Sequence, residues 1–93
     1  MNKLRRLHEY IKNYNHCAFR PVVNIERKCI YLIDNCGNKI FYNEMENEYT
    51  IKCRIKCIKD DNVITYLTKP VIMDLKAKKK RDVLAIINSR ICS

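Results

Sequence analysis

The fold is decided by the run Thr50-Ile51-Lys52-Cys53-Arg54-Ile55-Lys56-Cys57-Ile58-Lys59, in which apolar and basic residues alternate. Successive side chains of a β-strand point to opposite faces of a sheet, so the alternation predicts one long strand. One face is apolar and belongs to a core: Tyr49, Ile51, Cys53, Ile55 and Cys57. The other face is a basic row of Lys52, Arg54 and Lys56. The strand therefore requires a hydrophobic layer on one side only.

A second strand and a helix are predicted downstream of this run. The turn Asp60-Asp61-Asn62 leads into Val63 to Leu67, a β-branched and aromatic stretch, which predicts an antiparallel hairpin. Pro70 is expected to interrupt the edge strand that this stretch forms. Asp74 is expected to cap a final helix that runs to about Arg90. The apolar stripe of this helix comprises Leu75, Val83, Leu84, Ile87 and Ile91.

A helix and a first hairpin are predicted upstream. Residues 3 to 14 carry apolar side chains at spacings of three and four, which predicts an amphipathic helix with a basic back. The stripe comprises Leu4, Leu7, Ile11 and Tyr14. Pro21 favours an extended segment after it. The runs Lys28 to Ile33 and Lys39 to Tyr42 flank a turn that holds Gly37, the only glycine of the chain, and together predict a hairpin.

The order of helix, four or five antiparallel strands and helix predicts an α+β fold, a single antiparallel sheet flanked by N- and C-terminal helices. The 93 residues are expected to form a single domain, residues 1–93, with one thin core. No run of about 18 apolar residues predicts a membrane span, and the N-terminus lacks the apolar region of a signal peptide. We therefore expect an intracellular protein, cytoplasmic or nuclear, whose six cysteines are buried thiols rather than disulfides.

The formal net charge of +9 is unevenly distributed: +5 over residues 1–28, −3 over residues 29–49 and +7 over residues 50–93. Its densest cluster is Lys76-Ala77-Lys78-Lys79-Lys80-Arg81, at the start of the final predicted helix. Cations at a helix N-terminus oppose the helix macrodipole, so the cluster costs stability and indicates a polyanionic partner. The expected contacts are Lys76, Lys78, Lys79, Lys80 and Arg81, supported by Lys52, Arg54 and Lys56. Nucleic acid is the expected polyanion, and an anionic membrane surface is the alternative.

The order helix, strands, helix is accompanied by Leu7-His8-Glu9-Tyr10 in the first helix and by the lysine-rich start of the last. In these features the chain resembles the double-stranded RNA-binding domain, although it lacks that family's Gly-Pro-x-His loop and has an extra hairpin. The resemblance implies that Glu9 lies where the family's first helix reaches the RNA minor groove. It also places four lysines near the family's phosphate-clamping lysines: Lys76, Lys78, Lys79 and Lys80. Such a domain recognises the shape of A-form RNA.

Neither a metal site nor catalysis is predicted. The candidate zinc ligands contain no Cys-x-x-Cys cluster: His16, Cys17, Cys29, Cys36, Cys53, Cys57 and Cys92. Cys53 and Cys57 would lie about 13 Å apart at about 3.3 Å per residue, too far to share one ion. Neither His8 nor His16 is tied to a nucleophile by a motif, and Asp60-Asp61 is interpreted as a turn. We therefore expect no enzyme and no cofactor.

Two further features bear on the kind of partner. The acidic turn Glu44 to Glu48 would pair with a basic patch of a neighbouring copy or of a protein partner. Four aromatic residues would offer stacking to single-stranded bases, although alternation places half of them in the core: Tyr31, Phe41, Tyr42 and Tyr66. The sequence therefore predicts a small basic nucleic-acid-binding protein that contacts the phosphate backbone, with double-stranded RNA as the ligand that the resemblance implies. The alternative is a protein-interaction or assembly module of viral type, homo-oligomeric or bound to another protein, for which the acidic turn and an exposed apolar patch would be the distinguishing features. The viral origin is suggested by the abundance of Ile, Lys, Asn and Tyr, which is typical of AT-rich genomes such as those of large DNA viruses.

Overall fold

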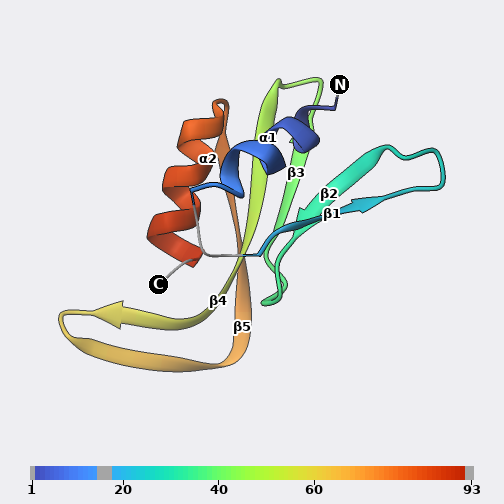
Figure 1. Cartoon of the computed structure of the whole chain (residues 1–93). Helices are drawn as coiled ribbons and strands as arrows, with labels where there is room; N and C mark the ends of the chain where they lie inside the picture. Colours follow the sequence, from blue (N-terminus) through green and yellow to red (C-terminus); the bar gives the residue numbers. More distant parts are fainter. Residues whose placement is uncertain (1, 15–17, 92–93) are drawn as a thin grey trace.

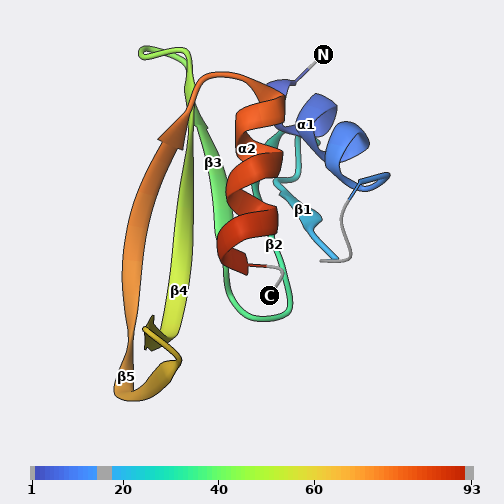
Figure 2. The ribbon, with the colours of Figure 1, turned by 90° about the vertical axis from the view of Figure 1, so that its left-hand side faces the viewer.

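The computed structural model describes residues 2–14 and 18–91, and within them all side chains except those of residues 56–59, 90 and 91. The elements are α1 (Lys3–Ile11), β1 (Arg20–Val23), β2 (Cys29–Ile33), β3 (Lys39–Asn43), β4 (Glu48–Asp60), β5 (Val63–Ala77), α2 (Lys80–Ile86) and the π-helical turn η1 (Ile87–Ile91). The five strands form one antiparallel sheet in the order β1-β2-β3-β4-β5, and both helices lie on the same face of it (Figures 1 and 2). The predicted α+β fold is confirmed.

Helix α1 packs its apolar stripe against the sheet. Asn2 caps the helix, because its side-chain oxygen accepts the backbone N–H of Leu4 at 2.7 Å and satisfies a donor without an intrahelical partner. Leu4, Leu7 and Ile11 are buried, as their spacing predicts. Tyr14 lies beyond the end of the helix and is exposed. The sequence therefore predicts the buried face of the helix correctly, but the predicted helix is longer than the observed one.

The core lies between the sheet and the two helices. Strand β4 contributes Tyr49, Ile51 and Cys53, all buried as the alternation predicts. The other core residues are Leu4, Leu7, Ile11, Phe19, Cys29, Leu32, Ile40, Ala77, Val83 and Ile87. Burial raises the pKa of the Cys29 thiol above its usual range, and the charge of Arg5 acts in the opposite direction. The expected burial is thus confirmed for Cys29 and Cys53.

Not every cysteine follows that expectation. Cys36 is exposed in the turn between β2 and β3, where an alternating pattern no longer governs burial. Cys17 and Cys92 lie outside the described residues, and Cys57 lies outside the described side chains.

Strand β5 corrects the prediction of the last helix. The sequence predicts an edge broken at Pro70 and a helix capped by Asp74, but β5 runs through both residues to Ala77. Asp74 pairs with Lys52 of β4, and the register is continuous from there to the end of the strand. This ladder of cross-strand pairs outweighs the local helix propensity, which is a weak preference. The predicted helix cap is therefore wrong.

Helix α2 consequently begins six residues later than Asp74, at Lys80. Its N-cap is Lys79, which makes no side-chain capping hydrogen bond. Leu75, predicted on the apolar stripe of the helix, is a half-buried strand residue instead. Val83 and Ile87 are buried as predicted, and Leu84 packs against the core. The apolar stripe is thus correct for Val83, Leu84 and Ile87, and the side chain of Ile91 lies outside the described side chains.

The far part of the β4–β5 hairpin projects beyond both helices. Strand β3 pairs only with the first residues of β4, so the rest of the hairpin has two strands. The register shifts where the pair of Ile55 with Val71 gives way to the pair of Cys57 with Tyr66, which leaves additional residues on β5. Figures 1 and 2 show the hairpin bending sharply in this region and extending away from the helices. We call residues 56–70 the arm.

The turn between β2 and β3 is built on a buried carboxylate. Asp34 Oδ1 accepts the backbone N–H groups of Cys36 at 3.0 Å and of Asn38 at 2.8 Å, and its Oδ2 accepts the side-chain amide of Asn38 at 2.8 Å. Asn38 Oδ1 accepts the backbone N–H of Arg54 at 2.7 Å, which ties the turn to β4. Gly37 has a φ of 89°, a conformation that glycine adopts without strain. The network therefore fixes the end of the sheet next to the arm.

Replacement of Asp34 by alanine is expected to destabilise the protein by about 2 kcal/mol, because three donors lose their acceptor in a buried place. In a domain of this size that free energy lowers the melting temperature by roughly 8 to 16 °C. Glu44→Ala removes an exposed carboxylate and is expected to cost less than about 0.5 kcal/mol. Thermal unfolding followed by circular dichroism measures both variants, and equal melting temperatures would contradict this role of Asp34.

Candidate functional site

Exposed cations concentrate at the end of the molecule where both helices begin. Lys78 and Lys79 connect β5 to α2, and Lys80 and Arg81 form the first residues of α2. All four side chains are exposed. The N-terminal ends of α1 and α2 lie at the same end of the molecule (Figures 1 and 2). This part of the predicted site is therefore on the surface and close to α1.

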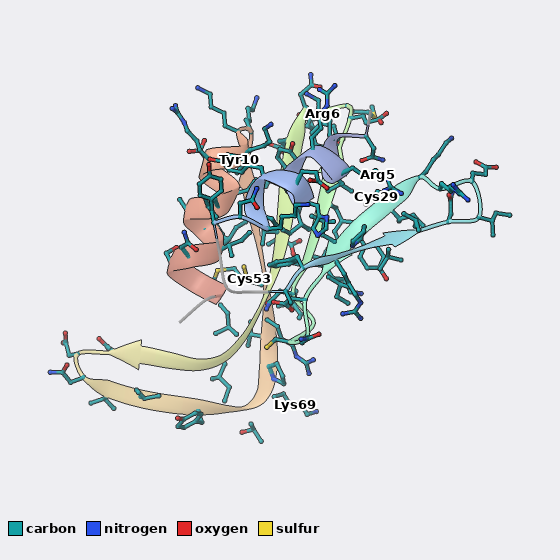
Figure 3. All side chains as sticks on the ribbon, viewed as in Figure 1. Arg5, Arg6, Tyr10, Cys29, Cys53 and Lys69 are labelled. Carbon is teal, nitrogen blue, oxygen red and sulfur yellow. The ribbon has the colours of Figure 1, made fainter. Side chains whose placement is uncertain are left out.

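Helix α1 adds two cations on its flank toward α2. Lys3, Arg6 and Tyr10 follow one another at spacings of three and four, which places them on one side of the helix. The Nζ atom of Lys80 lies 5.7 Å from the centroid of the Tyr10 ring, so this flank faces α2. Burial raises the pKa of the nearby Tyr49, and the guanidinium of Arg6 acts in the opposite direction. Figure 3 shows Arg6 at this end of the molecule.

We call this group the basic end and define it by six residues: Lys3, Arg6, Lys78, Lys79, Lys80 and Arg81. Within the part of the chain that the structure describes, the ion pairs involve other residues, and none of these six cations has a carboxylate partner. Like charges held together without neutralisation disfavour the compact state. The charges of the cluster therefore do not contribute to the stability of the fold.

Two other predicted contacts lie on the outer face of the sheet, opposite the helices, and are paired with acids. Lys52 Nζ lies 3.4 Å from Asp74 Oδ2. Lys76 Nζ, in β5 rather than in a helix, lies 3.6 Å from Glu48 Oε1. A phosphate would have to compete with these carboxylates. Lys52 and Lys76 are thus neutralised, unlike the six cations of the basic end, and Lys76 lines a hollow together with Lys78 and the α2 residues Asp82, Ala85 and Ile86.

The remaining predicted contacts lie in different environments: Arg54, Lys56 and Glu9. Arg54 is exposed and covers the turn between β2 and β3, where its Nη1 would lie 3.3 Å from a Cβ at Gly37. The side chain of Lys56 lies outside the described side chains. Glu9, implied by the resemblance as a minor-groove contact, is exposed and pairs with Lys12 at 2.8 Å. The hydrogen bond and charge of Lys12 lower the pKa of Glu9.

The outer face also carries residues that the sequence alone did not single out. Lys39 pairs directly with Lys52 in the sheet, a like-charge juxtaposition that is unfavourable by itself. Its Nζ atom lies 5.2 Å from the centroid of the Tyr31 ring, and Tyr31 lies 5.2 Å from Phe41. The cation is therefore placed over an aromatic pair on a face that no helix covers.

The two other aromatic residues proposed for base stacking lie elsewhere. Tyr42 packs against the core, with its ring 5.0 Å from that of Tyr49. Tyr66 lies in the arm and is exposed. The expectation that alternation places half of this set in the core is wrong: of the four, Tyr42 alone packs against the core, and it is half-buried.

Sequence reasoning missed three functional candidates: Lys3, Arg6 and Lys39. The helical spacing of α1 already places Lys3 and Arg6 off the apolar stripe, but it cannot tell which flank faces α2. Lys39 starts a predicted strand, but its neighbour across the sheet depends on the register. All three assignments therefore required tertiary structure.

Within the described residues, no three side chains of His, Cys, Asp or Glu gather in a way that would hold a metal ion. His16, Cys17, Cys57 and Cys92 fall outside that statement. No described helix is long and apolar enough to cross a bilayer.

Comparison of the chain with protein-family models, with curated proteins and with solved structures gives no match.

Proposed function

We propose that the protein binds nucleic acid through the phosphate backbone, with the basic end as its main contact. The observation that carries the proposal is the run of four exposed cations from Lys78 to Arg81, joined by Lys3 and Arg6 of α1, without a carboxylate partner among the described residues. Such a cluster neutralises phosphates and releases their condensed counterions, which favours binding. Phosphate contacts position a protein and carry little sequence information.

Double-stranded RNA is the ligand that we place first, on the resemblance to the double-stranded RNA-binding domain. In that proposal α1, including Glu9, would approach the minor groove, and the start of α2 would lie against phosphates. Lys52, Arg54, Lys56 and Lys76 are supporting contacts. Lys52 and Lys76 are expected to contribute less, because each would first have to leave its carboxylate.

Fluorescence anisotropy tests the proposal directly. The protein is titrated into a labelled RNA duplex of about 20 base pairs, the matching DNA duplex and a single strand, each over a range of salt. We expect the RNA duplex to be preferred, with a slope of log K against log salt of about −4 to −5 if most of the basic end contacts phosphates.

The outcomes separate the alternatives. Preference for the single strand would reject the duplex assignment and would direct attention to the outer face, where Lys39, Tyr31 and Phe41 lie together. No binding to any of the three at low salt would overturn the proposed function.

A further inference from the structure

Among the residues that the structure describes, the outer edge of the arm is an apolar strand without a neighbouring strand. β5 is the last strand of the sheet, so its outer edge presents unpaired N–H and C=O groups. Val63, Ile64 and Tyr66 are 62%, 51% and 78% exposed. Between Val63 and Met73 the sequence has a single charged residue, Lys69. Edges of this kind are normally shortened, charged or covered, because they pair readily with another strand.

The arm also lacks support from the rest of the fold. Beyond the end of β3 it has two strands, and it lies clear of the helices in both views (Figures 1 and 2). A two-stranded hairpin without a packed layer is marginally stable in water, and a third strand or a packed layer is needed for independent stability. An additional strand along β5 would supply both hydrogen bonds and apolar contacts.

We propose that this strand is β5 of a second copy, added antiparallel across a two-fold axis at Thr65. In that register Thr65 faces Thr65 of the second copy, Ile64 faces Tyr66, and Val63 faces Leu67. The two arms form a four-stranded sheet. Aromatic and β-branched residues opposite each other are among the favourable cross-strand pairs. A two-fold interface requires a self-complementary surface, and this stretch has one.

Charge complementarity favours a second copy over an unrelated strand. The same register brings Asp61, in the turn at the tip of the arm, next to Lys69 of the second copy, and it does so at both ends of the interface. Figure 3 shows Lys69 at the bend of the hairpin, which is the other end of the paired stretch. Pro70 lies just outside this stretch, so its missing N–H costs no hydrogen bond there and limits pairing beyond it.

The small area of the interface indicates a weak dimer. From their exposed fractions, Val63, Ile64 and Tyr66 present roughly 400 Å² per protomer, so these side chains bury at most about 800 Å² in total. Interfaces at this low end of the size range are weak and reversible, and we expect a dissociation constant in the micromolar range. The dimer would carry two basic ends, one on each protomer.

Substitutions at Thr65 test the register as well as the dimer. Thr65→Lys places two cations opposite each other at the two-fold axis, and Thr65→Glu places two anions there. Each variant alone is expected to dissociate at least about tenfold more readily than the unchanged chain, because like charges directly opposite are destabilising. An equimolar mixture of the two variants is expected to recover the dimer as a heterodimer. Sedimentation velocity from about 10 to 500 µM protein measures all four samples.

Asn88→Lys is the control, because it adds the same charge at an exposed position of η1 and is expected to leave association unchanged. Circular dichroism establishes that each variant is folded. A chain that is monomeric throughout the concentration range overturns the proposal. A dimer that Thr65→Lys leaves intact, or a mixture of variants that does not associate, equally overturns it.

Discussion

Charge reversal of Lys78 and Lys79 to glutamate is expected to weaken nucleic-acid binding by a factor of about 10 to 100 at roughly 0.1 M salt. Both residues are exposed in the connection between β5 and α2, outside the core, so the fold is expected to be retained. Each lost phosphate contact removes about 0.9 from the magnitude of the slope of log K against log salt. The slope is therefore expected to fall by about 2, for every sequence tested.

The matched control is the double variant Arg20→Glu and Lys28→Glu. It changes the net charge by the same amount, and both residues are exposed and lie outside the basic end and outside α1. Long-range electrostatic attraction to the nucleic acid falls equally in the two double variants, whereas direct phosphate contacts are lost only in K78E/K79E. An unchanged slope in K78E/K79E, or equal losses in both double variants, would show that the basic end makes no specific contribution.

The two proposals concern opposite ends of one molecule. The basic end holds the exposed cations at the start of the helices, whereas the arm extends from the far end of the β4–β5 hairpin (Figure 1). A dimer joined through the arms would present two basic ends to one nucleic acid. The second contact would then be intramolecular, so avidity would exceed the affinity of one basic end. We therefore expect Thr65→Lys to weaken binding to a long duplex more than binding to a short one.

The sequence predicts those parts of the fold that depend on local periodicity. The alternation from Tyr49 to Cys53 and the stripe of Leu4, Leu7 and Ile11 each bury the residues expected. Both hairpins appear where turn residues separate β-rich runs, and Gly37 adopts the positive φ that its turn requires. These features follow from side-chain geometry within a few residues and need no knowledge of distant neighbours.

The parts that could not be predicted depend on long-range pairing. Asp74 is a good helix cap by type, yet its place opposite Lys52 in the sheet makes it a strand residue and a salt-bridge partner. The same pairing converts Lys76 from a helix residue into a neutralised strand residue. Arg6 joins the basic end only because α1 packs with one flank toward α2. The sequence therefore predicts the four consecutive cations of the candidate site, but it does not predict how far the site extends.

Replacement of Leu7 by alanine is expected to destabilise the protein by about 3 kcal/mol. Leu7 has no exposed surface and lies in the middle of the stripe that holds α1 on the sheet. The lost contacts and the remaining cavity both contribute, because a well-packed core relaxes only in part. The melting temperature is expected to fall by roughly 12 to 24 °C in thermal unfolding followed by circular dichroism.

Ile25→Ala is the control, since it also shortens an aliphatic side chain, but at a residue that is fully exposed, and it is expected to change stability by less than about 0.5 kcal/mol. Because α1 positions Arg6 beside the start of α2, loosening its packing is also expected to weaken nucleic-acid binding at temperatures where the Leu7 variant is still folded. A Leu7→Ala variant as stable as Ile25→Ala would mean that α1 does not pack on the sheet as described. A destabilised variant with unchanged nucleic-acid binding would instead mean that α1 does not belong to the proposed interface. The interface would then consist of Lys78 to Arg81 alone.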